Sequence, residues 1–243
     1  MMVRTAAILS GGEGRRLGGL AKESILMDGE ALGPRLVRLL ARRFGRIIVV
    51  TKNPGLYEGL GAETTADILP GMGPLSGLHA AFSQLGPGRD EWIWLAAVDM
   101  PGFDPGFVDL LEARLESSIE ALSPDNPDRP GACMARFAEH FEPFQAIWSS
   151  RLLPDLEQLL HRRSSDGSTR HPSFSDLVAI CQVSWVSEKE ARIVSPDWRL
   201  FHNINRIEDF ASSEALFEVH HLGAKSTSKY GLAERQFFGK GQG

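Results

Sequence analysis

Short apolar runs alternate along the chain with segments in which apolar residues recur at helical spacing. The runs at 6–9, 47–50 and 92–98 contain no polar alternation, which predicts strands buried on both faces of a sheet. The segments at 32–44, 74–85 and 107–115 have the helical period. This order predicts βα units that form a mostly parallel sheet with helices on both faces, a doubly wound three-layer α/β sandwich.

The second half of the chain is less regular. We expect a strand at 146–148, a helix at 152–160, a mobile polar segment at 164–173, a last strand at 182–186 and a final helix after residue 202. Residues 1–217 are interpreted as one domain. Residues 218–243 are polar and without period, which predicts a disordered C-terminal tail.

Composition narrows the function classes. The chain has 243 residues, is 42% hydrophobic and 23% charged, and carries a formal net charge of −5, so no global basic field would attract nucleic acid or an anionic membrane. Two cysteines are too few for a disulfide framework. The N-terminal residues lack the long apolar stretch of a signal peptide, and no run approaches membrane-spanning length. We therefore expect a cytoplasmic enzyme or binding protein.

A glycine-rich loop follows the first strand. It resembles two phosphate-binding motifs but fails each at a decisive position: Leu20 stands where a Walker A loop needs lysine, and Leu17 where the dinucleotide fingerprint needs glycine. One alternative is a tight strand-to-helix turn with solvated arginines. The glycines, together with Arg15, Arg16 and Lys22, favour binding of an anion, because the backbone can approach closely and the side chains add positive charge. A triphosphate is a plausible ligand.

Two aspartates follow the predicted strands. Asp99 comes directly after the strand at 92–98 and precedes Met100-Pro101, which makes it a candidate ligand for a hard divalent cation such as Mg²⁺. The alternative is a helix-capping or turn aspartate. Asp67 precedes a Gly/Pro-rich turn that leads into a predicted helix, and a simple loop is the alternative there.

Four segments together resemble a known family. "LSGGEGRRLGG…K", "GPLSGL", "LAAVDMP" and "FHNINRIEDF" occur in the order and spacing of nucleotidyltransferases of the nucleotide-diphospho-sugar transferase-like fold. They are most similar to the molybdenum cofactor guanylyltransferases, the MobA family, over roughly residues 5–217. The resemblance implies transfer of GMP from GTP to molybdenum-carrying molybdopterin, release of pyrophosphate, and Mg²⁺ as cofactor. It also implies protein partners, namely other proteins of cofactor biosynthesis and a recipient molybdoenzyme.

The resemblance also implies roles for individual residues. Asp99 would hold the metal ion, and Arg16, Lys22 and Asp99 would be catalytic. The second substrate would contact Gly77, Asn203 and Asn205. The residues implied in nucleotide binding are Leu9, Ser10, Gly11, Gly12, Lys22, Thr51, Asp67 and Asp99.

Three departures from the family pattern leave alternatives open. Ala21 replaces an aspartate, Arg206-Ile207 replaces Thr-Pro, and Glu30 stands where a basic residue is frequent. The changes at Ala21 and Arg206-Ile207, together with the extra tail, make a non-catalytic molybdenum-cofactor-binding chaperone one alternative. Transfer of a cytidylyl or other nucleotidyl group on the same fold is another, although Ser10 favours guanine because the cytidylyl relatives tend to have alanine there.

Overall fold

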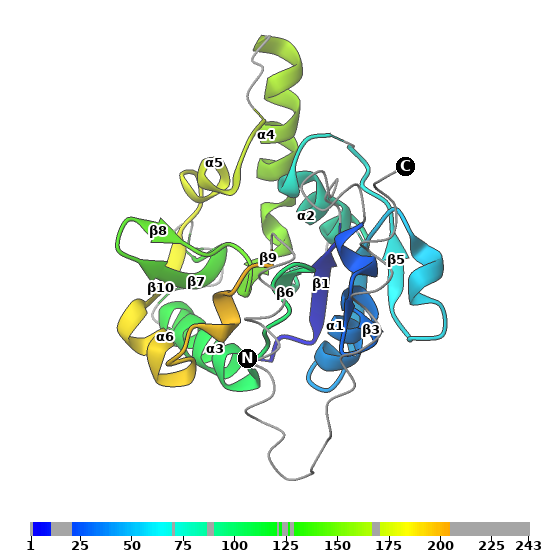
Figure 1. Ribbon diagram of the computed structural model, residues 1–243. Coiled ribbons are helices and arrows are strands. Elements are labelled where there is room, and N and C mark those ends of the chain that lie inside the picture. The colour runs from blue at the N-terminus through cyan, green and yellow to red at the C-terminus, as the bar shows by residue number, and fades with distance from the viewer. Residues whose placement is uncertain are drawn as a thin grey trace, which may run out of the picture.

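The computed structural model describes residues 2–10, 21–69, 71–86, 90–120, 122, 126, 129–166 and 171–204, with side chains omitted at 162–166. Its main feature is a sheet in the strand order β10-β7-β9-β6-β1-β4-β5, with β8 paired to β7 (Figure 1). The strands are β1 (Thr5–Leu9), β4 (Arg46–Val50), β5 (Glu63–Thr65), β6 (Trp92–Ala97), β7 (Ala132–Phe137), β8 (His140–Phe141), β9 (Ala146–Ser149) and β10 (Val183–Ser187).

Most of this sheet is parallel. β1 pairs in parallel with both β4 and β6, β4 with β5, and β10 with β7. β9 runs antiparallel to its neighbours β6 and β7, and the short β8 runs antiparallel to β7. Because β9 is reversed, its first residue lies at the edge where β6 ends.

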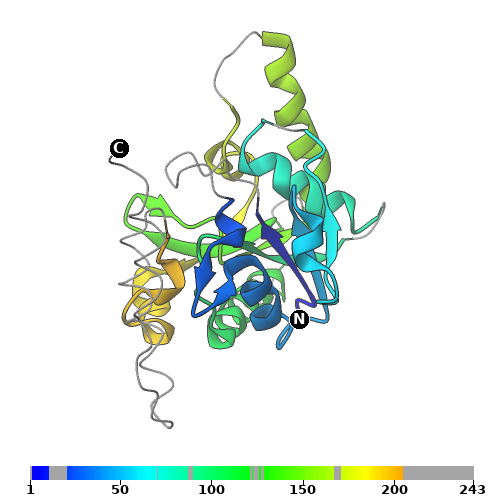
Figure 2. The same cartoon turned by 45° about the vertical axis from the view of Figure 1, so that its right-hand side comes forward.

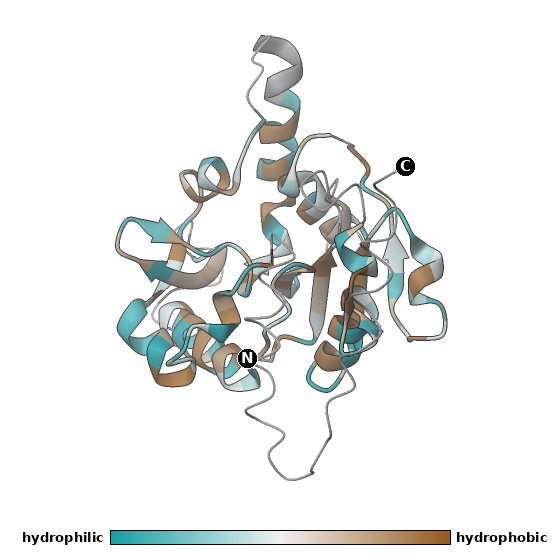
Figure 3. Ribbon diagram, viewed as in Figure 1, coloured by the Kyte–Doolittle hydropathy of each residue, from teal (hydrophilic) through white to brown (hydrophobic). Residues whose placement is uncertain are grey.

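Helices cover both faces of the sheet. One layer contains α1 (Leu32–Leu40), α3 (Pro105–Glu120) and α6 (Glu188–Val194), and the other contains α2 (Pro74–Ser83), α4 (Leu153–Asp166) and α5 (Phe174–Val178). Figures 1 and 2 show the first layer below the sheet and the second above it. Alternate residues of β1 point into the two cores, with Ala6 and Ile8 in one and Ala7 and Leu9 in the other. This confirms the predicted doubly wound sandwich, and Figure 3 shows the apolar character of β1.

The remaining elements are a short hairpin and several 3₁₀ helices. β2 (Leu26–Met27) and β3 (Glu30–Ala31) form a separate hairpin whose turn residues, Asp28 and Gly29, both have positive φ. Such a turn matches the twist of the paired strands. The 3₁₀ helices are η2 (Lys22–Ser24), η3 (Pro54–Tyr57), η4 (Ser150–Leu152) and η5 (Arg199–Phe201).

The strands and helices predicted at the N-terminal half are present, but the second half differs in places. The segment predicted as mobile from residue 164 begins inside α4, which continues to Asp166, and α5 begins at Phe174. The predicted final helix and tail lie outside the described residues. Within the described part of the chain, no helix combines the length and apolar composition that a membrane span requires.

Candidate active site

The carboxyl ends of β1, β4 and β6 lie side by side at one edge of the sheet. The last residue of β1 is in register with the last residues of β4 and β6. Ser10 and Thr51 directly follow β1 and β4, and Asp99 follows β6 after one intervening residue. Open α/β sheets bind their ligands at this edge.

Lys22 and Asp99 form an ion pair at this edge. Nζ of Lys22 lies 2.5 Å from Oδ2 of Asp99, and each side chain remains 19% exposed. The two residues come from η2 and from the turn after β6, which lie 77 positions apart in the chain. The pair offers an ammonium group for phosphate oxygens and a carboxylate for a divalent cation. The structure thus brings together two of the three predicted catalytic residues.

Glu23, the neighbour of Lys22 in the chain, is buried. Its side chain is only 2% exposed and accepts hydrogen bonds from three hydroxyl groups. Thr51 Oγ1 donates at 2.8 Å to Oε2, Tyr57 OH donates at 2.7 Å to the same oxygen, and Ser10 Oγ donates to it as well. These bonds attach η2 to the ends of β1 and β4 and so fix the place of Lys22.

Tyr57 completes this cluster through close packing against α1. Burial raises the pKa of Tyr57 well above its usual range, with a further contribution from Glu23, so the phenol stays protonated and donates. A Cβ added to Gly33 of α1 would lie 2.3 Å from the Tyr57 hydroxyl oxygen. Only glycine at position 33 therefore leaves room for the hydroxyl that reaches Glu23.

The sequence predicts nucleotide contacts for Ser10 and Thr51. Both side chains are buried, and their hydroxyl groups are engaged with Glu23. A role in aligning η2 is therefore visible for these two residues, and direct contact with a nucleotide stays a prediction. Glu23 itself was missed, because nothing in the local sequence indicates that this glutamate is buried.

The segment that contains Asn203 is hydrogen-bonded to the backbone of Asp99. The backbone N–H of Ile204 donates to the Asp99 carbonyl oxygen at 2.7 Å. Asn203, the preceding residue, is exposed. The structure thus brings the backbone next to one of the two predicted asparagines to Asp99, and contact of Asn203 with a substrate stays a prediction.

Asp67 and Gly77 have contacts of a different kind. Oδ2 of Asp67 accepts a hydrogen bond of 2.8 Å from Ser76 Oγ, which attaches the loop after β5 to the first turn of α2. Gly77 is buried in α2, where an added Cβ would lie 3.0 Å from a methyl carbon of Leu9. Gly77 therefore permits close packing of α2 on β1. Contacts of Leu9, Asp67 and Gly77 with substrates remain predictions.

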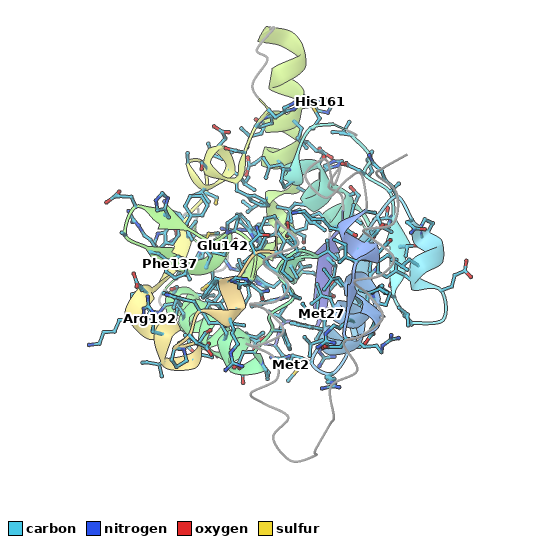
Figure 4. All side chains as sticks on the ribbon, in the orientation of Figure 1. Met2, Met27, Phe137, Glu142, His161 and Arg192 are labelled. Carbon is cyan, nitrogen blue, oxygen red and sulfur yellow. The ribbon has the colours of Figure 1, made fainter. Side chains whose placement is uncertain are left out.

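Two residues that the sequence analysis missed, Glu142 and Gln145, lie in the turn before β9. The pKa of Glu142 is raised to about 7, mainly by burial. The hydrogen bond that it accepts from the Phe144 N–H lowers this pKa, and the negative charge of Asp99 raises it. Glu142 is labelled in Figure 4. Gln145 is buried and donates to carbonyl oxygens in the turn after Asp99. In the sequence of this turn, only the Glu-Pro pair at 142–143 could have indicated a functional residue, and such a pair is a weak indication.

The negative charge of Glu30, noted above as a departure from the family pattern, is compensated. Glu30 accepts hydrogen bonds from the Arg38 guanidinium of α1, and the neighbouring Asp28 pairs with Arg35 at 3.1 Å. The acidic hairpin is thus neutralised by the exposed side of α1. Gly11, Gly12, Arg16 and Asn205 lie outside the described residues.

The carboxylates present suit Mg²⁺ bound together with a phosphate ligand. Among the described residues no group of three or more His, Cys, Asp or Glu side chains could enclose a metal ion. Mg²⁺ commonly takes only one or two protein carboxylates and completes its shell with phosphate oxygens and water. Asp99 and the nearby Glu142 provide that number of carboxylates at the open edge of the sheet.

Comparisons with known proteins identify the family. The family described as "MobA-like NTP transferase domain" matches residues 6–173. The molybdenum cofactor guanylyltransferase of Syntrophotalea carbinolica is 33% identical over 86% of this chain and 90% of its own length. The probable molybdenum cofactor guanylyltransferase of Peptoclostridium acidaminophilum is 32% identical over 84% of this chain and 86% of its own.

Solved structures support the fold. Molybdopterin-guanine dinucleotide biosynthesis protein A from Archaeoglobus fulgidus superposes with a TM-score of 0.68 at 22% identity and covers 88% of this chain and 99% of its own. The 2-C-methyl-D-erythritol 4-phosphate cytidylyltransferase from Thermus thermophilus gives a TM-score of 0.55 at 16% identity and covers 90% of this chain and 100% of its own. Because the family match and the two relatives cover most of the chain, the chain belongs to the MobA-like family of NTP transferases.

Proposed function

We propose that this protein transfers GMP from GTP to molybdenum-carrying molybdopterin and releases pyrophosphate. The observation that carries the proposal is the Lys22–Asp99 pair at the carboxyl edge of the sheet, in a chain whose relatives are named molybdenum cofactor guanylyltransferases. An oxygen of the molybdopterin phosphate forms a bond to the α-phosphorus of GTP. The bond from that phosphorus to the bridging oxygen of pyrophosphate breaks, so the protein needs no covalent intermediate.

The residues of the site contribute alignment and charge. Lys22 is placed to exchange its contact with Asp99 for a phosphate oxygen of the bound triphosphate, where its charge stabilises the leaving pyrophosphate. Glu23 keeps η2 in place through its buried hydrogen bonds. Mg²⁺ held by Asp99 would neutralise further charge on the phosphates. Asn203 would contact the second substrate; its neighbour Ile204 is hydrogen-bonded to the Asp99 backbone, which supports this role.

Two experiments test this proposal. Calorimetric titration with GTP, CTP, ATP and UTP, each with and without Mg²⁺, should give the tightest binding for GTP with Mg²⁺. Pyrophosphate release with GTP and molybdopterin should then proceed at steady turnover. Asp99→Ala should abolish that turnover with the fold intact, while Glu139→Ala, which removes an exposed carboxylate, should leave it unchanged.

The outcomes separate the alternatives. Preference for CTP would retain the fold and the site but change the product to a cytosine dinucleotide. Binding of molybdopterin without turnover of any nucleotide would favour the non-catalytic chaperone. Full activity of Asp99→Ala would contradict the metal assignment.

A further inference from the structure

Gln145 combines burial with an uncommon backbone conformation. It directly precedes β9, its side chain is in the core with the residue 1% exposed, and its φ is +52°. Residues other than glycine rarely adopt this left-handed conformation, and asparagine tolerates it better than glutamine does. A buried amide in a disfavoured backbone conformation indicates that the side chain is needed where it is.

The amide of Gln145 is bonded to the turn that follows Asp99. We call residues 99–102 the Asp99 turn. Nε2 of Gln145 donates to the carbonyl oxygens of Met100 at 3.2 Å and Gly102 at 2.8 Å. Because both partners are acceptors, they fix which end of the amide faces the turn. The opposite end, Oε1, is buried without a hydrogen-bond partner among the described residues.

The Asp99 turn also contacts the segment 199–204. A Cβ added to Gly102 would lie 2.3 Å from the Arg199 carbonyl oxygen, so the two backbones are in close contact. The Ile204 N–H donates to the Asp99 carbonyl oxygen. The turn is thus in contact with both Gln145 and this segment. The backbone N–H of Gln145 donates to the Leu95 carbonyl oxygen at 2.7 Å, which attaches Gln145 to β6.

We propose that Gln145 is a positioning residue that sets the orientation of the Asp99 carboxylate for metal–nucleotide binding. Its two donated hydrogen bonds fix the backbone of the Asp99 turn, and the same turn before β9 contains Glu142, on which the charge of Asp99 acts. The proposal rests on the proposed function only in assigning a metal–nucleotide complex to Asp99. It does not depend on which base or acceptor the protein uses.

The test measures metal affinity directly. Mn²⁺ binding to the protein with saturating GTP is followed by electron paramagnetic resonance, beside calorimetric binding of GTP in EDTA. Gln145→Leu removes both donors at similar volume and should weaken Mn²⁺ binding about tenfold or more, the range known for groups that orient metal ligands. Binding of metal-free GTP should change less than twofold. Gln84→Leu, at an exposed glutamine that follows α2 and donates to Thr65 of β5, is the matched control and should leave both unchanged.

A second variant separates the amide from the backbone strain. Gln145→Asn suits the left-handed conformation but is one methylene too short to reach the turn, so it should fold and still weaken Mn²⁺ binding about tenfold. Wild-type metal affinity in either folded variant, with only a lower Tm, would overturn the proposal. If wild-type protein binds Mn²⁺ with CTP and not with GTP, the proposed function fails, and the same comparison with CTP still tests Gln145.

Discussion

Glu23 illustrates how one buried carboxylate can organise an active site at a distance from the chemistry. Its oxygens accept from hydroxyl groups of residues after β1, after β4 and in η3, and its neighbour Lys22 reaches Asp99. A buried charge is stable only when its hydrogen-bonding capacity is satisfied. The three hydroxyl donors meet this requirement, so η2, which carries Lys22, is held in place.

Neutralising this carboxylate should destabilise the protein. Glu23→Gln retains the shape and can keep an oxygen at the Oε2 position, but it removes the negative charge that three hydroxyl groups face and puts an NH₂ group beside Thr51 Oγ1, which lies 3.1 Å from Oε1. We expect a loss of about 1–3 kcal/mol in the free energy of unfolding. Urea denaturation measures it. Glu58→Gln, at an exposed glutamate of the same region, should cost less than about 0.5 kcal/mol. Equal stability of the two variants would refute the anchoring role of Glu23.

Glu142 predicts a specific dependence of stability on pH. Its pKa rises from 4.5 to about 7 on folding, so between these values the folded state binds more protons than the unfolded state. Stability contributed by this group is therefore full below about pH 4.5 and falls as pH rises through 7. Glu142→Gln removes the effect, and without nucleotide or metal it should gain stability over wild type between pH 4.5 and pH 8, by up to about 3 kcal/mol.

Urea denaturation at a series of pH values tests this sign. The exposed Glu139→Gln serves as the control for charge removal in the same hairpin and should show no comparable trend. A difference between Glu142→Gln and wild type that stays constant with pH, or that shrinks as pH rises, would contradict the raised pKa.

At the scale of elements, α1 must approach η3 closely. Alanine normally stabilises a helix relative to glycine, by up to about 1 kcal/mol. At position 33 the added Cβ would lie 2.3 Å from the Tyr57 hydroxyl oxygen, so Gly33→Ala should instead destabilise by about 1–3 kcal/mol. In the Tyr57→Phe background the hydroxyl is absent and the nearest ring atom, Cζ, would lie 2.9 Å from the added Cβ, so the same substitution should cost less but still destabilise.

A double-mutant cycle of Gly33→Ala and Tyr57→Phe, measured by urea denaturation, therefore tests the contact. The predicted result is a coupling of at least about 1 kcal/mol between the two substitutions. Additive effects would show that the helix and η3 can move apart without cost.

The elements that the sequence predicts best are those whose apolar residues follow one another without interruption by polar residues. β1, β4 and β6 were predicted because apolar runs without polar alternation are typical of buried parallel strands. β7 was not, because its sequence, Ala-Cys-Met-Ala-Arg-Phe, lacks β-branched residues, and its burial comes from neighbours far apart in the chain. The start of α6 carries a capping box of Ser187 and Glu190 that the sequence analysis overlooked.

The candidate site was predicted in the same uneven way. Lys22 and Asp99 each follow a buried strand and belong to motifs that resemble those of one family. The sequence therefore predicts that both lie in one site. Glu23, Glu142 and Gln145 have no such signal, because whether a polar side chain is buried and paired depends on tertiary contacts. Their roles could only emerge from the arrangement of the whole sheet.

At the scale of the whole molecule, the reversed strand β9 explains how the site is assembled. In a purely parallel sheet each carboxyl edge receives only the loops that follow strands. Because β9 is antiparallel to β6, the turn that precedes it meets the turn that follows β6. The site thus combines Lys22 from the first βα unit, Asp99 from the centre and Glu142 and Gln145 from the second half of the chain.

The most direct measurement of the central claim is a competition assay with product identification. Purified protein is incubated with molybdenum-carrying molybdopterin, Mg²⁺ and equal concentrations of GTP and CTP, and the dinucleotides are separated by chromatography and identified by mass. The account predicts that the guanine dinucleotide predominates, with one pyrophosphate released per dinucleotide formed. Predominance of the cytosine dinucleotide would contradict it. Failure to form any dinucleotide, when the molybdopterin substrate is shown to be intact, would contradict it as well.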